Sequence, residues 1–322
     1  MPSDKAPRIL VAGCGAIGSM FGGLLRAAGN DVTLLGRAWH LDAVRANGIH
    51  IDGIWGNHHA SGFMLATCAG DLDGSYNLTL ISVKSYDTES MVKSIAPHLD
   101  PSGLAVSLQN GLGNVEELVS AFGSTRSFGA SILIGATIPQ PGRVTVTVQA
   151  APVVLGPWEA TQDAMLRAES LAGLMSAASI PCLATNCIAS SLWAKAFYNA
   201  ALNAVGTLLD VHYGALGDDA DLRAVMDGVM AEAFAVAQAQ AVPLPWSTGL
   251  EYQEHFYASL LPATYLHRSS MLQDIEHGRR TEIEAINGAI WRLGREAGIA
   301  TPYNELLTHL IRGLEGRDRG ER

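Results

Sequence analysis

The chain has 322 residues, of which 48% are hydrophobic and 16% charged, against about 25% charged residues in typical soluble proteins. This composition can bury a large core and excludes an intrinsically disordered chain, and the length suggests about two domains. Acidic residues outnumber basic ones by 31 to 21, so the net charge is -10, which argues against nucleic acid as a partner. The ten histidines show no metal-ligand spacing, and we assign no metal.

The cysteines and the N-terminal region indicate where the protein resides. The four cysteines form no C-x-x-C pair, as is typical of a reduced, intracellular protein. The uncharged stretch 9–25 follows Lys5 and Arg8 and imitates a signal peptide, but its five glycines and its short length argue against a membrane helix. We therefore expect a cytoplasmic protein with no membrane partner.

The first half of the chain alternates between strand and helix signals. Short apolar runs at 8–12, 32–35, 77–83 and 103–108 predict buried parallel strands. A helix is predicted at 16–28, after the first run, and helical spacing also follows the runs at 77–83 and 103–108. This alternation predicts an α/β fold with a Rossmann-type, doubly wound sheet.

The strand pattern changes near residue 128. Two β-rich runs, 128–138 and 143–149, are separated by Pro139-Gln140-Pro141-Gly142, which predicts a hairpin at an antiparallel edge of the sheet. A helix at 161–178 and a short strand at 181–184 follow. We assign residues 1–186 to this cofactor-binding domain.

Beyond residue 186 the strand signals disappear. Helical spacing recurs in five segments, at 189–205, 220–241, 248–261, 271–297 and 304–314. We therefore predict that residues 187–322 form an all-helical C-terminal domain that binds the substrate and carries catalysis. Its alanine and leucine content is compatible with a homodimer.

The first predicted strand ends in a G-x-G-x-x-G motif, Gly13-Cys14-Gly15-Ala16-Ile17-Gly18. In this strand-to-helix context the first glycine permits a tight turn, the second admits a pyrophosphate and the third allows close packing. The helix N-terminus then offers unpaired N–H groups to the phosphates. A glycine-rich packing contact is the alternative, and we favour dinucleotide binding.

Two basic residues sharpen the choice of dinucleotide. An NAD site usually has an acidic residue after the second strand, whereas here Leu35-Gly36 leads to Arg37. A guanidinium suits the 2′-phosphate of NADP, although a solvated surface arginine has the same pattern. Lys84 directly follows the strand 77–83, at the edge where doubly wound sheets bind ligands. We predict NADP, with NAD as the alternative.

Asn110 stands in Gln109-Asn110-Gly111, after the strand 103–108. Its amide can hydrogen-bond a ribose or a substrate carbonyl. It can equally stabilise its own turn, because Asn-Gly is a common turn pair. The spacing alone does not separate these interpretations.

An apolar helical stretch at 190–206 carries Lys195, Asn199 and Asn203 at steps of four, so the three side chains project from nearly one face. Burial among apolar residues lowers the pKa of an ammonium, which suits a proton donor to a forming alkoxide. The alternative is a lysine that reaches solvent beside two ordinary asparagines. We favour catalysis.

The segment 267–284 adds further polar groups. Ser270-Met271-Leu272-Gln273 matches S-x-x-Q and predicts Ser270 as a helix N-cap, although a helix N-terminus also suits a substrate carboxylate. Gly278 makes the segment either one kinked helix or two short ones. In one straight helix Ser270 and Glu282 would be about 18 Å apart, too far to contact the same small substrate.

With these residues in view, the sequence resembles the ketopantoate reductase (2-dehydropantoate 2-reductase) family over residues 8–315. The resemblance is carried by an ordered set of motifs: the glycine motif with Arg37 and Val83-Lys84, then Leu108-Gln109-Asn110-Gly111, then Trp193-Ala-Lys195 with Asn199 and Asn203, then Ser270-Met-Leu-Gln-Asp274 leading to Arg280-Thr-Glu282-Ile283. It implies an oxidoreductase of pantothenate biosynthesis that reduces a 2-oxo acid with NADPH.

The resemblance also implies roles for individual residues. Lys195 matches the proton donor, and Glu282 matches a carboxylate that contacts the cofactor and partners the lysine. The matches to substrate-binding positions are Asn199, Asn203 and Ser270, and Asn110 matches a residue near both nicotinamide and substrate. The matches to cofactor contacts are Arg37, Lys84 and, more loosely, the backbone of Ala136.

One departure touches the substrate pocket: Tyr213 stands where some members have a further asparagine. This leaves the identity of the 2-oxo acid open. The alternatives are a reductase of the same fold that acts on another 2-oxo acid, and a cofactor-binding sensor without catalysis.

Overall fold

The structure, a computed structural model, describes residues 7–320. Its internal contacts divide the chain into two compact units. The first comprises residues 1–109 and 114–188, and the second comprises residues 110–113 and 189–322. The short segment 110–113 thus belongs to the second unit although it follows a strand of the first.

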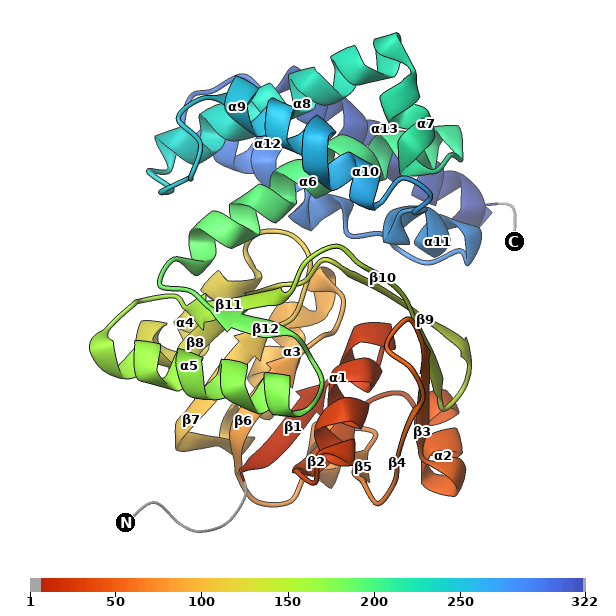
Figure 1. Ribbon diagram of the computed structural model, residues 1–322, viewed down its shortest axis with the longest axis vertical. Coiled ribbons are helices and arrows are strands. Elements are labelled where there is room, and N and C mark those ends of the chain that lie inside the picture. The colour runs from red at the N-terminus through yellow and green to blue at the C-terminus, as the bar shows by residue number, and fades with distance from the viewer. Residues whose placement is uncertain (1–6, 321–322) are drawn as a thin grey trace. The chain divides into compact units, whose positions relative to one another are not determined.

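The first unit contains an eight-stranded sheet with the strand order β12-β11-β8-β7-β6-β1-β2-β5 (Figure 1). Neighbouring strands are parallel except β8 and β11, which are antiparallel. The bounds are β1 (Arg8–Ala12), β2 (Asp31–Leu35), β5 (Met64–Ala66), β6 (Tyr76–Ile81), β7 (Leu99–Ser107), β8 (Ser127–Ser131), β11 (Val153–Pro157) and β12 (Cys182–Ala184). The predicted α/β class with a parallel sheet is confirmed.

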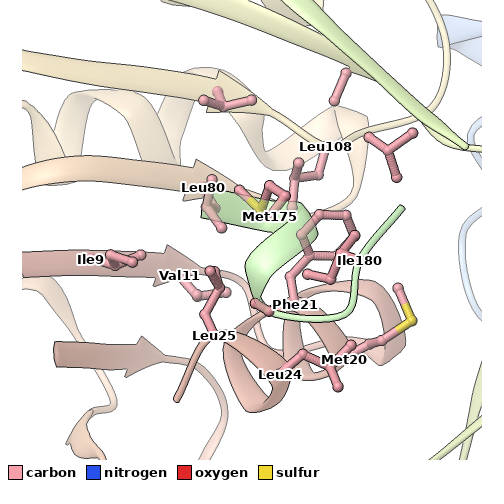
Figure 2. Packing of buried hydrophobic residues seen from close by; sticks show 14 of the residues in the cluster. Ile9, Val11, Met20, Phe21, Leu24, Leu25, Leu80, Leu108, Met175 and Ile180 are labelled. Carbon is pink, nitrogen blue, oxygen red and sulfur yellow. The ribbon is translucent and has the colours of Figure 1, made fainter. Parts of the chain in front are cut away.

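Helices cover both faces of this sheet, because its central strands, such as β1 and β6, have buried residues on both sides. Ile9 and Val11 of β1 join a buried cluster with α1 (Ala16–Ala27) and α5 (Gln162–Ala177), and Figure 2 shows this packing. Leu10 and Ala12 join the opposite cluster with α3 (Thr88–Ile95) and α4 (Asn114–Phe122). The sheet is therefore doubly wound, as predicted.

A second, four-stranded sheet has the order β4-β3-β10-β9. Its strands are β3 (Ile49–Gly53), β4 (His58–Ala60), β9 (Ile134–Gln140) and β10 (Arg143–Gln149), and α2 (Ala38–Asn47) precedes β3. The predicted hairpin is present as β9 and β10, but its placement at the edge of the main sheet is wrong. The strand β3, which the sequence pattern did not reveal, pairs in parallel with β10. The antiparallel edge of the main sheet is formed instead by β11 and β12, which are parallel to each other and antiparallel to the other strands.

The described part of the second unit is built from helices and turns. The helices are α6 (Ile188–Leu209), α7 (Tyr213–Asp218), α8 (Ala220–Ala239), α9 (Gly249–His255), α10 (Leu261–Ala263), α11 (Ser270–Glu276), α12 (Asn287–Glu296) and α13 (Pro302–Gly320). Phe197 of α6 packs in the core of this unit against Phe234 and Tyr252. Within residues 7–320 no helix is both long and apolar enough to span a bilayer.

The helical spacing at 271–297 does not correspond to one continuous helix, because the chain breaks after α11. Gly278 has a φ of +61°, a left-handed conformation that glycine adopts without strain. A short 3-10 turn, η6 (Ile283–Ala285), separates this break from α12. Of the two forms left open by the sequence, the one with two short helices is correct.

Candidate active site

The three glycines of the loop between β1 and α1 have different surroundings. Gly13 has a φ of +107°, and a Cβ there would lie 2.6 Å from the Val83 nitrogen. A Cβ on Gly18 would lie 2.0 Å from the Gly13 carbonyl oxygen. Gly15, the residue that precedes α1, has nothing within 4 Å of its Cβ position. Packing thus requires the first and third glycines, while the second leaves space for phosphate oxygens at the helix N-terminus.

Hydrogen bonds join the loops at the carboxyl ends of β2, β1 and β6. The Gly13 N–H donates to the Leu35 carbonyl at 2.9 Å, and the Ser82 N–H donates to the Ala12 carbonyl at 2.9 Å. The Ser82 hydroxyl also donates to the Gly13 carbonyl at 2.5 Å. These bonds fix the glycine loop between the loops that carry Arg37 and Lys84.

Arg37 and Lys84 occupy the same edge of the sheet as the glycine motif, as predicted. Arg37 is exposed and follows Gly36, whose Cβ would lie 2.7 Å from the Cys14 Cβ. Lys84 is partly buried directly before the 3-10 turn η2 (Ser85–Asp87). The residues of this edge therefore fit a dinucleotide, with a glycine cradle between two cationic side chains.

Two other residues of the predicted cofactor site have a different character. The Cys14 thiol is buried and donates to the Leu35 carbonyl at 3.4 Å, and burial raises its pKa to about 12. Cys14 thus contributes packing and its backbone rather than a reactive thiolate. Ala136 lies on β9, partly buried and paired with Val146, and its backbone contact to a cofactor stays a prediction.

The segment after β7 contains a residue that supports a neighbouring loop, Gln109, and a candidate site residue, Asn110. The buried Gln109 donates to the Val83 carbonyl at 2.9 Å, so it supports the loop that carries Lys84. Gly111 has a φ of +86°, and its Cβ would lie 2.4 Å from the Ala285 oxygen. Asn110 therefore belongs to a turn packed on η6, the 3-10 turn that follows Glu282.

Lys195, Asn199 and Asn203 lie on α6 at steps of four, as the sequence predicts. Their exposed fractions are 7%, 7% and 3%, so the alternative of a lysine that reaches solvent is wrong. Burial lowers the pKa of Lys195 from 10.5 to about 8, and the nearby Glu282 carboxylate partly opposes this shift. At neutral pH most of the side chain is an ammonium that readily gives up its proton.

Asn199 provides an observation that points to a ligand. Its Nδ2 is buried and has no hydrogen-bond partner among the described residues. A buried amide N–H without a partner is destabilising unless a ligand or a water accepts from it. The group lies one helical turn from Lys195, so an acceptor-rich ligand can satisfy both.

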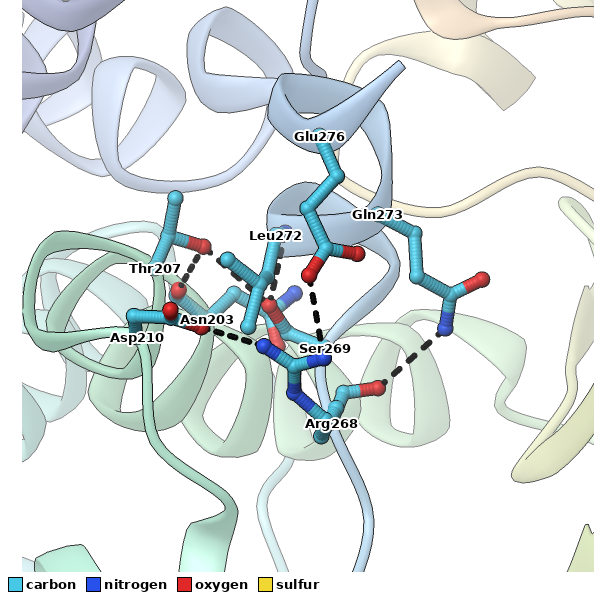
Figure 3. A network of polar contacts seen from close by, with 8 residues as sticks. All are labelled: Asn203, Thr207, Asp210, Arg268, Ser269, Leu272, Gln273 and Glu276. Atoms are coloured by element: carbon cyan, nitrogen blue, oxygen red, sulfur yellow. Dashed lines mark hydrogen bonds and ion pairs between the residues drawn. The ribbon is translucent and has the colours of Figure 1, made fainter.

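The series of polar residues on α6 extends one step further than predicted, to Thr207. This buried hydroxyl donates to the Asn203 carbonyl at 2.7 Å and lies 3.1 Å from the Ser269 Oγ (Figure 3). The same step of four that identifies Asn203 also reaches Thr207, so the sequence held this signal. It held none for the contact with Ser269, which is 62 residues away.

The prediction that Ser270 caps its helix is wrong by one residue. Ser269 is the N-cap of α11, with extended backbone, and its Oγ accepts from the Leu272 N–H at 3.0 Å. Ser269 is buried, whereas the side chain of Ser270 is exposed. Only Ser270 matches S-x-x-Q, but serine is a good N-cap at either position, and the buried contact with Thr207 favours Ser269. The substrate-binding role of Ser270 stays a prediction.

Glu282 is held in the segment between the Gly278 break and α12. The adjacent Thr281 N–H donates to Glu315 of α13 at 2.7 Å, and the Thr281 hydroxyl accepts from the Ile283 N–H at 3.2 Å. Glu282 itself is only 7% exposed. Its carboxylate opposes the lowering of the Lys195 pKa by burial, so it acts electrostatically on the ammonium although the two residues are 87 positions apart in the sequence. Among residues 7–316, whose side chains the structure describes, no cluster of three His, Cys, Asp or Glu side chains is suited to a metal ion.

Comparisons with known proteins identify the family. The family described as ketopantoate reductase PanE/ApbA matches residues 9–160, and its C-terminal counterpart matches residues 188–315. The chain is 34% identical to the 2-dehydropantoate 2-reductase of Aquifex aeolicus (strain VF5) over 309 residues, which covers 96% of this chain and 97% of that protein. It is 31% identical to the enzyme of the same name from Pyrococcus abyssi (strain GE5 / Orsay), over 96% of this chain and 98% of the relative.

Solved structures give the same result. A PanE/ApbA family ketopantoate reductase from Ralstonia eutropha JMP134 has a TM-score of 0.85 and 30% identity, over 97% of this chain and 99% of that one. A D-mandelate dehydrogenase solved with NADH and anilino(oxo)acetate has a TM-score of 0.87 and 27% identity, again over 97% and 99%. Together with the family match, the NADH complex of this neighbour indicates a nicotinamide cofactor. The chain belongs to the ketopantoate reductase family of oxidoreductases.

Proposed function

We propose that this protein reduces 2-dehydropantoate to pantoate with NADPH, the step that supplies pantoate for pantothenate. The observation that carries the proposal is the buried Lys195 ammonium, whose pKa is lowered to about 8, one turn from the unpartnered Asn199 amide. The relatives named 2-dehydropantoate 2-reductase support the choice of substrate.

Lys195 acts as the proton donor. When bound, NADPH supplies the hydride that reduces the carbonyl carbon of the substrate. The Lys195 Nζ donates a proton to the carbonyl oxygen, so that one hydride and one proton convert the 2-oxo group into a hydroxyl group. Before the transfer is complete, the ammonium stabilises the negative charge that develops on this oxygen. The Glu282 carboxylate stabilises the protonated form of Lys195, so the proton donor stays protonated near neutral pH.

The substrate is bound by hydrogen-bond donors, since a 2-oxo acid presents only acceptors at its carboxylate and carbonyl groups. The Asn199 NH2 group has no partner among the described residues, so it is available to a substrate oxygen. Asn203, Asn110 and the exposed Ser270 hydroxyl complete the set that we assign to the substrate. Asn110 and Glu282 also contact the nicotinamide half of the cofactor in this proposal.

The cofactor is NADP rather than NAD. Arg37 follows β2 at the position where an acidic residue would accept from the ribose of NAD, and its fork of donors suits a 2′-phosphate. The loop Gly13–Gly18 holds the pyrophosphate, and Lys84 and the backbone of Ala136 provide further contacts. The NADH bound to the D-mandelate dehydrogenase belongs to that protein, and a direct comparison of the two cofactors is therefore required.

Activity measurements test the reaction and the role of Lys195. We expect purified protein to oxidise NADPH with 2-dehydropantoate faster than with other 2-oxo acids, including aromatic ones. Lys195→Ala should lower kcat by about 10³-fold, as the removal of a general acid does. Lys93→Ala is the matched control, because this exposed lysine pairs with Glu89 on the surface of α3. A folded Lys195→Ala protein with wild-type turnover would refute the assignment.

A charge reversal tests the cofactor preference. Arg37→Asp should weaken NADPH binding by about 10- to 100-fold, because a charge-assisted pair with the 2′-phosphate is lost, and should leave NADH binding nearly unchanged. Arg45→Asp, on the exposed side of α2, the helix that begins directly after Arg37, controls for the change in net charge. Equal losses for both cofactors would contradict recognition of the 2′-phosphate.

A further inference from the structure

Tyr213 is buried at the start of α7 and is held on several sides. It is 2% exposed, and its N–H donates to the His267 carbonyl at 3.0 Å. Its ring packs edge to face against Tyr198 at 5.9 Å and against His267 at 5.2 Å. With its backbone and ring both fixed, the position of the Tyr213 hydroxyl is also fixed.

This hydroxyl donates a hydrogen bond to the Asn203 Oδ1 at 2.7 Å. Burial raises the pKa of Tyr213 well above its ordinary value, so the group is a phenol and a donor throughout the neutral range. An asparagine side chain has one acceptor oxygen and one NH2 group that can only donate. Because the oxygen is occupied by Tyr213, Asn203 presents its NH2 group to a ligand.

The backbone of Asn203 is fixed as well. Its carbonyl accepts from Thr207, which in turn contacts Ser269, the N-cap of α11 (Figure 3). Arg268 forms ion pairs with Asp210 and Glu276 in the same network and ties the end of α6 to α11. The remaining freedom of Asn203 is rotation of its amide, and this is the freedom that the Tyr213 hydroxyl removes.

Donors therefore follow one another along α6 toward Lys195. The ammonium of Lys195 and the unpartnered Asn199 Nδ2 lie at successive steps of four, and the NH2 group of Asn203 is the third. An anionic ligand with several oxygens suits such a row. If the Asn203 amide rotated, its carbonyl would face the oxygens of that ligand and repel them.

We propose that Tyr213 is a positioning residue of the substrate site, which holds the Asn203 amide with its NH2 group available to the 2-oxo acid. This inference rests on the proposed function. It assigns to Tyr213 no contact with the reacting atoms, since it acts through Asn203. The expected consequence is an effect on substrate affinity and little effect on the chemical step at Lys195.

The experiment is a double-mutant cycle measured with NADPH and 2-dehydropantoate. Tyr213→Phe should raise KM about five- to tenfold, the range for the loss of one hydrogen bond, while kcat changes by less than about twofold. Asn203→Ala should also raise KM, and adding Tyr213→Phe to it should change KM no further. An unchanged KM in Tyr213→Phe, or an equal rise with and without Asn203, would overturn the proposal.

Tyr198→Phe is the matched control. Tyr198 lies in the same aromatic cluster and is also buried. Its hydroxyl, however, donates to Thr264 at 2.7 Å and not to a candidate substrate-binding residue. The two Tyr→Phe variants should lose similar thermal stability, and only Tyr213→Phe should raise KM. A similar rise in KM for both variants would indicate a merely structural role and overturn the proposal.

A second variant guards against misfolding of Tyr213→Phe. Asn203→Asp keeps an acceptor for the Tyr213 hydroxyl and removes the NH2 donor, so it should raise KM more than Tyr213→Phe does. An unchanged KM would overturn the inference. Failure of the proposed function is distinguishable from failure of the inference. If no tested 2-oxo acid supported NADPH oxidation by the wild type, both the proposed function and the inference would be refuted. Normal wild-type turnover with an unchanged KM in the Tyr213 variants would refute the inference alone.

Discussion

The candidate site of the first unit is formed mainly by backbone groups, and that of the second unit mainly by buried side chains. In the first unit the glycine loop and the adjoining strand ends are arranged by backbone hydrogen bonds, and the space at Gly15 is open because a side chain is lacking. In the second unit the site consists of buried side chains on α6, whose properties depend on burial and on partners from distant segments.

This difference determines how each site responds to change. A site made of backbone is sensitive to the addition of a single carbon atom and insensitive to pH, since peptide groups do not titrate. A site made of buried polar side chains is sensitive to the protonation of Lys195 and to the loss of individual hydrogen bonds. The following substitutions separate these two kinds of sensitivity, beginning with the largest expected effect on stability.

Alanine at two glycines of the same loop should have opposite consequences. Gly18→Ala places a Cβ 2.0 Å from the Gly13 oxygen and 2.3 Å from the Ser82 Oγ, so we expect a loss of about 3 kcal/mol of unfolding free energy or more. Gly15→Ala places its Cβ in open space, so the stability should stay near wild type while NADPH binds more weakly. Urea unfolding and cofactor titration measure the two effects.

A third glycine provides the control for these substitutions. Gly173 lies in α5 with nothing within 4 Å of its Cβ position, and Gly173→Ala should leave cofactor binding unchanged. If Gly15→Ala bound NADPH as tightly as Gly173→Ala does, the open space at Gly15 would not be the position of the pyrophosphate. The backbone description of this site would then be wrong.

Titration of Lys195 should make stability depend on pH. The pKa of this lysine is 10.5 in an ordinary environment and about 8 in the fold, so between these values the unfolded chain binds more protons than the folded chain. Stability should therefore rise with pH through this window, by about 2 kcal/mol between about pH 7.5 and about pH 10. The rise in stability accompanies a loss of activity, because the deprotonated lysine cannot donate.

The contribution of Lys195 is isolated by difference. Urea unfolding of the wild type and of Lys195→Gln at several pH values gives two curves, and all other titrating groups cancel between them. Above pH 8 the free energy of unfolding of the wild type should rise relative to that of Lys195→Gln. Relative to Lys93→Gln, a variant at an exposed site, the wild type should show no such rise. Parallel curves for the wild type and Lys195→Gln would contradict the lowered pKa.

The sequence predicted the position of the glycine loop better than it predicted the contacts of the α6 side chains, for a physical reason. The glycine motif, Arg37 and Lys84 each follow a strand, and parallel strands bring their carboxyl ends to one edge of the sheet. Local signals were therefore sufficient. The hairpin β9–β10 was misplaced because its partner β3 has few apolar residues and only five residues in all.

In the second unit the sequence predicted what a helix repeats and missed what tertiary contacts add. The step of four along α6 placed Lys195 and Asn199 correctly and also extended to Thr207. The contact of Tyr213 with Asn203 depends on how α7 packs on α6, which no local pattern encodes. The homodimer predicted from composition and the substrate role of Ser270 stay predictions.

The smallest expected effect distinguishes two neighbouring serines. Ser269→Ala removes the cap on the Leu272 N–H and the contact with Thr207, so it should lower the unfolding free energy by about 1 kcal/mol. Ser270→Ala changes an exposed side chain in the first turn of α11 and should leave stability within about 0.5 kcal/mol.

The same two variants separate support from binding when KM for 2-dehydropantoate is measured. Ser270→Ala should raise KM if the exposed hydroxyl contacts the substrate carboxylate. Ser269→Ala should mainly lower the free energy of unfolding, with a smaller effect on KM. Because the residues are adjacent and the substitution is the same, differences in expression or net charge cannot account for a contrast between them. A stable Ser270→Ala protein with an unchanged KM would remove Ser270 from the site and leave substrate binding to the donors of α6 and to Asn110.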